Sequence, residues 1–311
     1  MESRIGVLLM ALGGPDSLDA VEPFLRSVRH GRPTPKAMVD EFSERYRRIG
    51  GKSPLLGISL DQARSLETRL NVRTDGFRCY VGMRHWSPYI RDVVARIRDD
   101  DIRRVVAVCL TPYYSKMSVG AYFADLDTAV AQSDAAMNIA RVESWHDRPE
   151  LIDAYARKAR EALERLPAEG RRDPVVLFTA HSLPRKIMQE GDPYERELQE
   201  TMMAVLKQLP PVRTRLCYQS AGRTEDPWLG PALEAVLDEL GGAGEEAVVV
   251  VPFGFVSDHL EILYDLDIEA KARAHGLGMR FERAESLNAD PRFISALEAV
   301  VREASAMRTW A

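Results

Sequence analysis

The fold is decided by a short apolar run near the start of the chain, Ile5-Gly6-Val7-Leu8-Leu9-Met10, which is followed by Gly13-Gly14-Pro15. A run of this length that ends at turn residues predicts a strand buried on both faces of a parallel sheet. Similar runs follow at 78–81, 105–110, 139–142, 175–178, 215–218, 247–255 and 279–282. Segments with helical spacing separate them, including 149–166, 193–209 and 231–240. This alternation predicts an α/β protein with right-handed crossovers.

The length of 311 residues favours two domains, and the apolar runs divide into four plus four. We expect one domain over residues 1–147 and a second over 148–311. No flexible linker separates the halves, so we expect them to pack around a cleft. Because parallel sheets bind ligands outside the carboxyl ends of their strands, the loops after the runs are the candidate site.

The overall composition excludes several classes of protein. With 42 Lys and Arg against 47 Asp and Glu, the net charge of −5 gives no basic footprint for nucleic acid or an anionic membrane. The first apolar run is too short for a transmembrane segment or a secretion signal. Cys79, Cys109 and Cys217 are too few for a four-cysteine zinc or iron–sulfur site. These features predict a cytoplasmic protein with reduced cysteines.

The stretch 257–269 is expected to form a helix after the seventh apolar run. Ser257 is a residue type that caps helix N-termini, and Asp258 in the first turn would suit the helix dipole. A three-residue spacing predicts a core-facing stripe of Leu260, Leu263 and Leu266.

Glu261, Asp265 and Glu269 recur every four residues on this expected helix. On a regular α-helix such a row drifts by about 40° per step. A slightly unwound, π-like turn would bring the three carboxylates into register, and such turns favour functional sites. No Lys or Arg lies between Asp258 and Glu269. An exposed acidic face is one interpretation, and a row of ligands for a bound or passing cation is the one we favour.

His181 follows the buried run 175–178 and is expected to point out of the sheet at its carboxyl end. A neutral imidazole accepts a proton or binds a metal, whereas a buried structural histidine is the alternative. His181 and Glu261 follow different strands of the same half, so the two side chains can face one another. Imidazole with carboxylate suits ferrous iron or another borderline divalent metal better than it suits a dedicated calcium cage, and a weak, transient metal site is predicted.

Motifs along nearly the whole chain resemble those of the ferrochelatase family, in the family's order. They are residues 7–15, 45–55, 81–84, 180–184, 191–194, 218–223, 227–231 and 254–261. The resemblance implies a chelatase-like fold of two flavodoxin-like domains, each with a four-stranded parallel sheet flanked by helices. It also implies a lyase of haem biosynthesis that inserts Fe²⁺ into a porphyrin.

The same resemblance implies the roles of the acidic row and of the histidine. His181 and Glu261 are implied as the catalytic pair and as metal contacts, and Asp265 and Glu269 as an outer divalent metal site or acidic path. Iron is then a substrate, with no permanent cofactor. The few cysteines and the short tail 307–311 leave out the iron–sulfur cluster found in some members.

Four residues in the first half match substrate-binding positions of the family. The resemblance implies that Arg29, Arg45 and Ser53 match positions that hold porphyrin propionates in the coproporphyrin-using branch. Guanidinium and hydroxyl donors suit carboxylates. Tyr122 matches a position in the cleft.

Two positions depart from the family pattern. Leu12 replaces a tyrosine that contacts the metal in some coproporphyrin enzymes, which excludes a phenolate ligand from that position. His30 stands where a second arginine often follows the first, so one propionate contact is weaker.

The segments 114–122 and 143–147 resemble the coproporphyrin branch, so coproporphyrin III is the favoured substrate and coprohaem the product. Protoporphyrin IX is the alternative substrate, and a cobalt chelatase or a non-catalytic tetrapyrrole carrier is the alternative protein. The expected partners are porphyrin, ferrous iron and, transiently, the next enzyme of the haem pathway.

Overall fold

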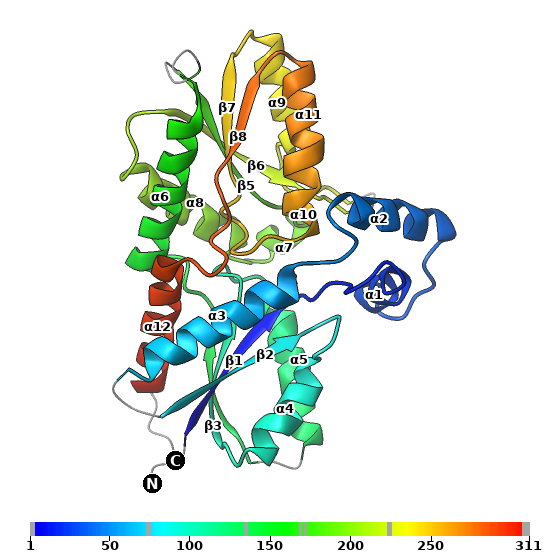
Figure 1. The fold of residues 1–311 in the computed structure, drawn as a ribbon, viewed down its shortest axis with the longest axis vertical. Coiled ribbons are helices and arrows are strands. Elements are labelled where there is room, and N and C mark those ends of the chain that lie inside the picture. The colour runs from blue at the N-terminus through cyan, green and yellow to red at the C-terminus, as the bar shows by residue number, and fades with distance from the viewer. Residues whose placement is uncertain are drawn as a thin grey trace. The chain divides into compact units, whose positions relative to one another are not determined.

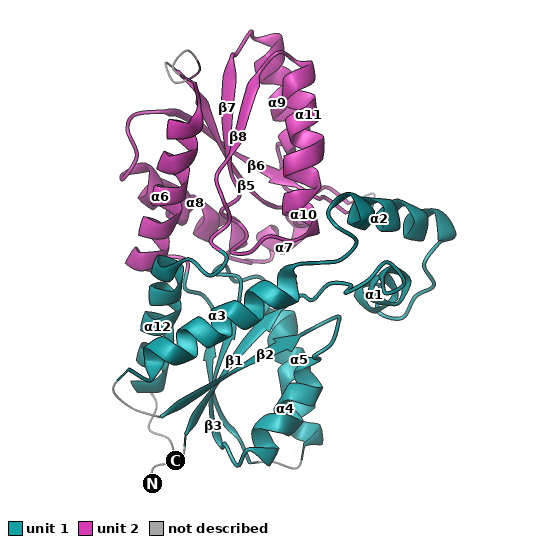
Figure 2. Ribbon diagram, viewed as in Figure 1, with its two compact units in different colours: residues 1–145, 288–311 teal, residues 146–287 magenta. Residues whose placement is uncertain are grey.

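The computed structural model describes residues 4–72, 76–133, 136–167, 170, 173–222 and 226–306. The chain forms two compact units, Met1–Trp145 with Asn288–Ala311, and His146–Leu287 (Figure 2). Arg223, which belongs to one quoted motif, and the tail 307–311 lie outside the described residues. Of the helices in the described part, none is long and apolar enough to cross a membrane.

Unit 1 is built on a four-stranded parallel sheet in the order β2-β1-β3-β4. Its strands are β1 (Ile5–Ala11), β2 (Phe77–Met83), β3 (Arg104–Cys109) and β4 (Asn138–Val142). Its helices are α1 (Val21–Val28), α2 (Lys36–Arg48), α3 (Leu55–Leu70), α4 (Ile90–Asp99), α5 (Val119–Gln132) and α12 (Pro291–Ala306). Leu8 and Met10 of β1 are fully buried in a core with Ile97 of α4 and Leu126 of α5 (Figure 1). Helices α4 and α5 therefore cover one face of this sheet.

Unit 2 repeats the design with a parallel sheet in the order β6-β5-β7-β8. Its strands are β5 (Val175–His181), β6 (Arg213–Gln219), β7 (Ala247–Val251) and β8 (Arg280–Arg283). Its helices are α6 (Pro149–Arg165), α7 (Arg185–Gln189), α8 (Tyr194–Leu206), α9 (Leu233–Gly242), α10 (Leu260–Leu263), the π-helix η1 (Asp265–Ala270) and α11 (Lys271–Gly276). Val248 and Val250 of β7 pack against Leu237 of α9 and Leu266 of η1, so these helices lie on one face of the sheet.

The eight strands expected from the apolar runs are all present, and the predicted α/β class is confirmed. The largest difference in length is in β7, which ends at Val251 rather than at 255. Pro252 lacks the N–H that would continue the strand, and Phe253 turns back to donate to the carbonyl of Val251 at 2.9 Å. Cys79, Cys109 and Cys217 are free thiols on strands.

The division of the chain differs from the expected one at its C-terminal end. The chain passes from unit 1 to unit 2 after Trp145, close to the expected boundary at 147/148. It returns at Asn288, so residues 288–311 belong to unit 1 rather than to the second unit. Phe293 of α12 packs on the buried ring of Trp145, with ring centroids 5.9 Å apart. Gln62 of α3 also donates to the carbonyl of Asn288 at 2.8 Å. Apolar packing therefore returns the last helix to the first unit.

Candidate functional site

The candidate site lies at the carboxyl ends of β5 and β6 in unit 2. His181 is the last residue of β5 and is paired in register with Gln219, the last residue of β6. Nδ1 of His181 lies 2.9 Å from Oε2 of Glu261 in α10. The side chain of His181 is 35% exposed and that of Glu261 is 27% exposed, so solvent reaches the pair although most of both side chains is covered by protein.

Hydrogen bonds from neighbouring side chains hold the main chains of His181 and Glu261 in place. The hydroxyl of Tyr194 donates to the carbonyl of His181 at 3.0 Å. Nε2 of Gln219 donates to the carbonyl of Glu261 at 2.8 Å, and Oε1 of the same amide is buried without a hydrogen-bond partner. Both members of the pair are therefore tied to the rigid sheet edge through their main chains.

A glycine lets the loop after β7 approach the strand that carries His181. The N–H of Gly254 donates to the carbonyl of Thr179 at 3.1 Å. A Cβ at position 254 would lie 2.6 Å from Cα of Ala180, closer than side-chain atoms normally come. Only glycine fits at this close approach.

The acidic row lies on an unwound helix, as the sequence predicts. One α-turn, α10, is followed by the π-helix η1, in which the carbonyl of Tyr264 accepts a hydrogen bond from the N–H of Glu269 at 3.0 Å. Asp265 accepts a hydrogen bond from Oγ of Ser220 at 2.7 Å. Ser220 follows β6 with φ of 58°, a left-handed conformation that is costly for a non-glycine residue and concentrates at functional sites. Glu269 is exposed, one turn beyond Asp265.

The expected helix start at Ser257 is wrong. The helix begins at Leu260, and the residue before it, His259, is extended and makes no side-chain cap. Ser257 is buried, and Asp258 lies outside the helix, where it accepts a hydrogen bond from Oγ of Ser286 at 2.7 Å.

The apolar stripe of this segment also differs from the expected one. Leu260 and Leu266 are buried as expected, but Leu263 is only half-buried and Ile262 is fully buried. A helix that changes from α to π spacing no longer presents every third residue to the core, and so the stripe changes register.

The charges of the site move the pKa values of its groups apart. Burial works against protonation of His181, but the charge and hydrogen bond of Glu261, aided by Asp265, prevail and raise the pKa of His181. Burial likewise opposes ionisation of Glu261, yet the neighbouring His181 lowers the pKa of Glu261 to about 2. Burial lowers the pKa of His259. The free protein therefore favours an imidazolium–carboxylate pair at His181 and Glu261 beside a neutral His259.

The four acidic and imidazole groups named from the sequence do not form one closed metal cage. Among the described residues, no three His, Cys, Asp or Glu side chains gather in a way that would hold a metal ion. His181 and Glu261 are in direct contact, Asp265 is close enough to raise the pKa of His181, and Glu269 stands apart and exposed. Such an open arrangement suits a metal that passes through more than one that stays.

The substrate-binding residues expected from the first half all lie in unit 1. Arg29 ends α1; its guanidinium donates to the carbonyl of Pro33 at 3.3 Å, while its Nε is buried without a hydrogen-bond partner. Arg45 of α2 is 21% exposed and pairs with Glu41 at 3.0 Å. The N–H of Ser53 donates to the carbonyl of Pro15 at 2.8 Å, which ties the loop before α3 to the loop after β1.

Three other residues singled out from the sequence also lie in unit 1. Tyr122 is buried in the core of α4, α5 and the sheet, with only 6% of its surface exposed. Most of its side chain therefore packs in this core. Leu12 is 37% exposed just after β1, and His30 adopts a left-handed φ of 54° after α1.

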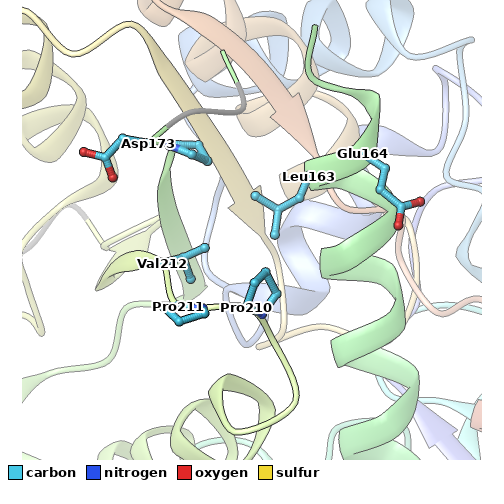
Figure 3. A pocket seen from close by; sticks show the side chains of 7 residues that line it. Leu163, Glu164, Asp173, Pro210, Pro211 and Val212 are labelled. Atoms are coloured by element: carbon cyan, nitrogen blue, oxygen red, sulfur yellow. The ribbon is translucent and has the colours of Figure 1, made fainter. Parts of the chain in front are cut away.

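A pocket of about 250 Å³ in unit 2 lies away from this site (Figure 3). It is lined by Leu163, Glu164, Asp173, Pro174, Pro210, Pro211 and Val212. Pro174 precedes β5 and Val212 precedes β6, so the pocket lies at the amino ends of the strands, opposite His181. None of the residues named above lines it.

Comparison with known proteins assigns the family. A family model described as ferrochelatase matches residues 4–305. The chain belongs to the ferrochelatase family. It is therefore an enzyme that inserts Fe²⁺ into a porphyrin, a lyase of haem biosynthesis whose substrates are porphyrin and iron.

Two relatives of this ferrochelatase match it over nearly their whole length. A ferrochelatase from Herpetosiphon aurantiacus is 41% identical over 303 residues, covering 97% of this chain and 99% of that protein. A coproporphyrin III ferrochelatase from Geobacillus kaustophilus is 38% identical, covering 100% of this chain and 98% of that protein. Among solved structures, SirB from Bacillus subtilis with Fe³⁺ shares the fold at 14% identity, with a TM-score of 0.61 and coverage of 97% and 96%.

Sequence reasoning did not assign several residues of this ferrochelatase that hold the pair. Tyr194, Gln219 and Ser220 contact His181, Glu261 and Asp265 but are absent from the predicted site. For Gln219 and Ser220 the signal was present, because they follow a buried run at the same sheet edge as His181. Tyr194 carries no such signal, since it reaches the site from the first turn of α8.

Proposed function

We propose that this ferrochelatase acts on coproporphyrin III and that His181 and Glu261 carry out the metallation. The proposed substrate is supported by full-length similarity to relatives named coproporphyrin III ferrochelatase, with 38% identity to those from Geobacillus kaustophilus and Geobacillus sp.. The observation that carries the site is the 2.9 Å contact between His181 and Glu261.

Cationic and hydroxyl groups of unit 1 support a substrate with several carboxylates. Arg29 follows directly after α1, Arg45 lies on α2, and the loop that leads from α2 into α3 carries Ser53. Nε of Arg29 is buried without a protein acceptor, and a carboxylate is the acceptor that a guanidinium prefers. We propose that these three side chains bind propionates. We propose Tyr122 as a further substrate contact, through the 6% of its surface that is exposed.

The reaction exchanges two pyrrole protons of the porphyrin for one Fe²⁺, so the protein must accept protons where it delivers the metal. The raised pKa of His181 and the lowered pKa of Glu261 keep one proton shared between them in the free protein. A metal cation that binds at the pair displaces this proton to solvent. When the metal moves on to the pyrrole nitrogens, the imidazole is free again and accepts one of the two pyrrole protons, and the second passes to the neighbouring carboxylates or to solvent. His181 is then the proton acceptor and a metal contact, and Glu261 a metal contact that orients the imidazole.

The remaining acids extend from the pair along η1. Asp265 is held by Ser220, and Glu269 is exposed one turn beyond it. We propose that they attract Fe²⁺ or hold an outer divalent metal, because neighbouring carboxylates raise the local cation concentration. No permanent cofactor and no iron–sulfur cluster belong to this proposal; the thiols of Cys109 and Cys217 are buried on strands of different sheets.

Comparative metallation tests the substrate. The protein is incubated anaerobically with Fe²⁺ or Zn²⁺ and with coproporphyrin III or protoporphyrin IX, and absorbance follows loss of the free-base spectrum. We expect repeated turnover with a higher kcat/KM for coproporphyrin III. Faster turnover of protoporphyrin IX would contradict the substrate, and a single stoichiometric spectral shift would indicate a carrier rather than an enzyme.

A further inference from the structure

We propose that Arg283 is a positioning residue for metal insertion, because its guanidinium contacts both Asp258 and Asp267, the two acids that flank Glu261 and Asp265 along the chain. This inference rests on the proposed roles of Glu261 and Asp265. Arg283 is the last residue of β8, outside the segment that carries those acids.

The guanidinium of Arg283 makes a two-point contact with Asp267 of η1. Its Nε donates to Oδ1 at 2.7 Å and its Nη2 donates to Oδ2 at 2.9 Å. Nη1 of the same group reaches Oδ1 of Asp258 at 3.4 Å, and Oγ of Ser286 donates to that oxygen at 2.7 Å. One guanidinium thus joins a residue that precedes α10 to a residue inside η1.

The segment between these two anchors is the one that carries the reactive carboxylates. Glu261 and Asp265 both lie between Asp258 and Asp267 in the chain, and the helix changes there from α to π spacing. A single α-turn and a short π-helix have little hydrogen-bonded length of their own, so tertiary contacts must hold them in place. Arg283 supplies such a contact at both ends.

Arg283 also divides the acids of this segment into two sets. Asp258 and Asp267 have a guanidinium as counter-charge, whereas Glu261 faces His181 and Asp265 faces the hydroxyl of Ser220. The segment that has no Lys or Arg between Asp258 and Glu269 is therefore partly neutralised by a guanidinium from β8.

The burial of Arg283 makes the contact worth more than a surface ion pair. Its side chain is 14% exposed, against 41% for Arg215, which makes a comparable two-point contact with Glu239 on the surface of the same unit. Exposed pairs contribute little to stability, while a fork-shaped contact in a protected site fixes geometry. Arg215 is accordingly a matched control.

The test compares Arg283→Met and Arg283→Lys with Arg215→Met. Metal insertion is measured with whichever porphyrin the wild-type enzyme uses better, and the KM for Zn²⁺, the KM for porphyrin and kcat are determined separately. Binding of Zn²⁺ alone is measured by calorimetry, without porphyrin. We expect Arg283→Met to raise the KM and Kd for Zn²⁺ about tenfold, with porphyrin KM within about twofold. Arg283→Lys keeps the charge but loses the two-point contact, so its KM and Kd for Zn²⁺ should lie between those of wild type and Arg283→Met. Arg215→Met should have the wild-type values.

A lower melting temperature with unchanged kcat, KM and Kd for Zn²⁺ would overturn the proposal, because Arg283 would then only stabilise the fold. If Arg283→Met does not fold, Asp267→Asn is assayed in the same way, and an unchanged KM for Zn²⁺ would equally overturn it. Failure of the proposed function has a different signature: wild-type protein would then not metallate either porphyrin, whatever residue stands at 283.

Discussion

His181 Nδ1 and Glu261 Oε2 lie 2.9 Å apart although the two residues are 80 positions apart in the chain. The contact joins the carboxyl end of β5 to the first turn of α10. An imidazole and a carboxylate at this distance share a proton strongly, and the same two groups are suitable ligands for a borderline divalent metal. Competition between proton and metal for this pair follows directly from the geometry.

Replacing Glu261 by Gln should shift the pH dependence of metal insertion to lower pH. Glu261 raises the pKa of His181, and insertion requires the neutral imidazole, so the wild-type rate rises with pH through that raised pKa. Glu261→Gln removes the charge, and the midpoint should fall by about one pH unit while the maximal rate also falls. The measurement is the pH profile of kcat/KM for the metal at saturating porphyrin, which reports the metal-free pair. A midpoint that stays in place would show that another group controls the rate.

The loss of one hydrogen-bond donor at Gln219 should weaken metallation beyond its effect on stability. Gln219→Leu removes the bond to the carbonyl of Glu261, and the free energy of unfolding should fall by about 1–3 kcal/mol. Gln62 of unit 1 is the matched control, since its Nε2 also donates to a main-chain carbonyl at 2.8 Å and its side chain is equally buried.

Gln62→Leu should cost similar stability with little change in the KM for metal, whereas Gln219→Leu should raise that KM several-fold. Urea unfolding and steady-state kinetics measure the two effects. Equal kinetic effects in the two variants would show that lost stability alone explains both.

Acid should destabilise the protein partly through His85. Burial, followed by the charge of Arg84, lowers the pKa of His85 from 6.5 to about 4, and Nδ1 of the ring lies 3.1 Å from Oγ of Ser27. The unfolded chain binds this proton at higher pH than the folded chain does. As the pH falls from about 6.5 to 4, His85 therefore removes up to about 3 kcal/mol of unfolding free energy.

His85→Asn should flatten this loss of stability. Urea midpoints at pH 7 and pH 4.5 measure it, and a wild-type-like difference between the two values in the variant would exclude His85 as the cause.

The eight strands could be predicted from the sequence because each is an apolar run that ends in turn residues, as the run 5–10 shows. The unwound helix could be predicted as well, because Glu261, Asp265 and Glu269 recur at a spacing that a regular α-helix does not align. Both signals are local, so they need no knowledge of distant parts of the chain.

The parts that could not be predicted depend on contacts between distant residues. The helix was expected to begin at Ser257, a favourable cap, but Arg283 and Ser286 hold Asp258 outside the helix. Residues 288–311 were expected with the second domain, but Trp145 and Gln62 hold them to the first. The order of residues along the chain does not show which surface an apolar helix will cover.

The most direct test of the account is single-turnover Fe²⁺ insertion by His181→Ala with porphyrin already bound. Porphyrin affinity, measured from the absorbance of the bound free base, should stay within about twofold of wild type. Insertion should slow by about 10²–10⁴-fold, because the variant has lost the group that accepts the pyrrole protons and contacts the metal. Insertion at the wild-type rate by the porphyrin-bound variant would contradict the account.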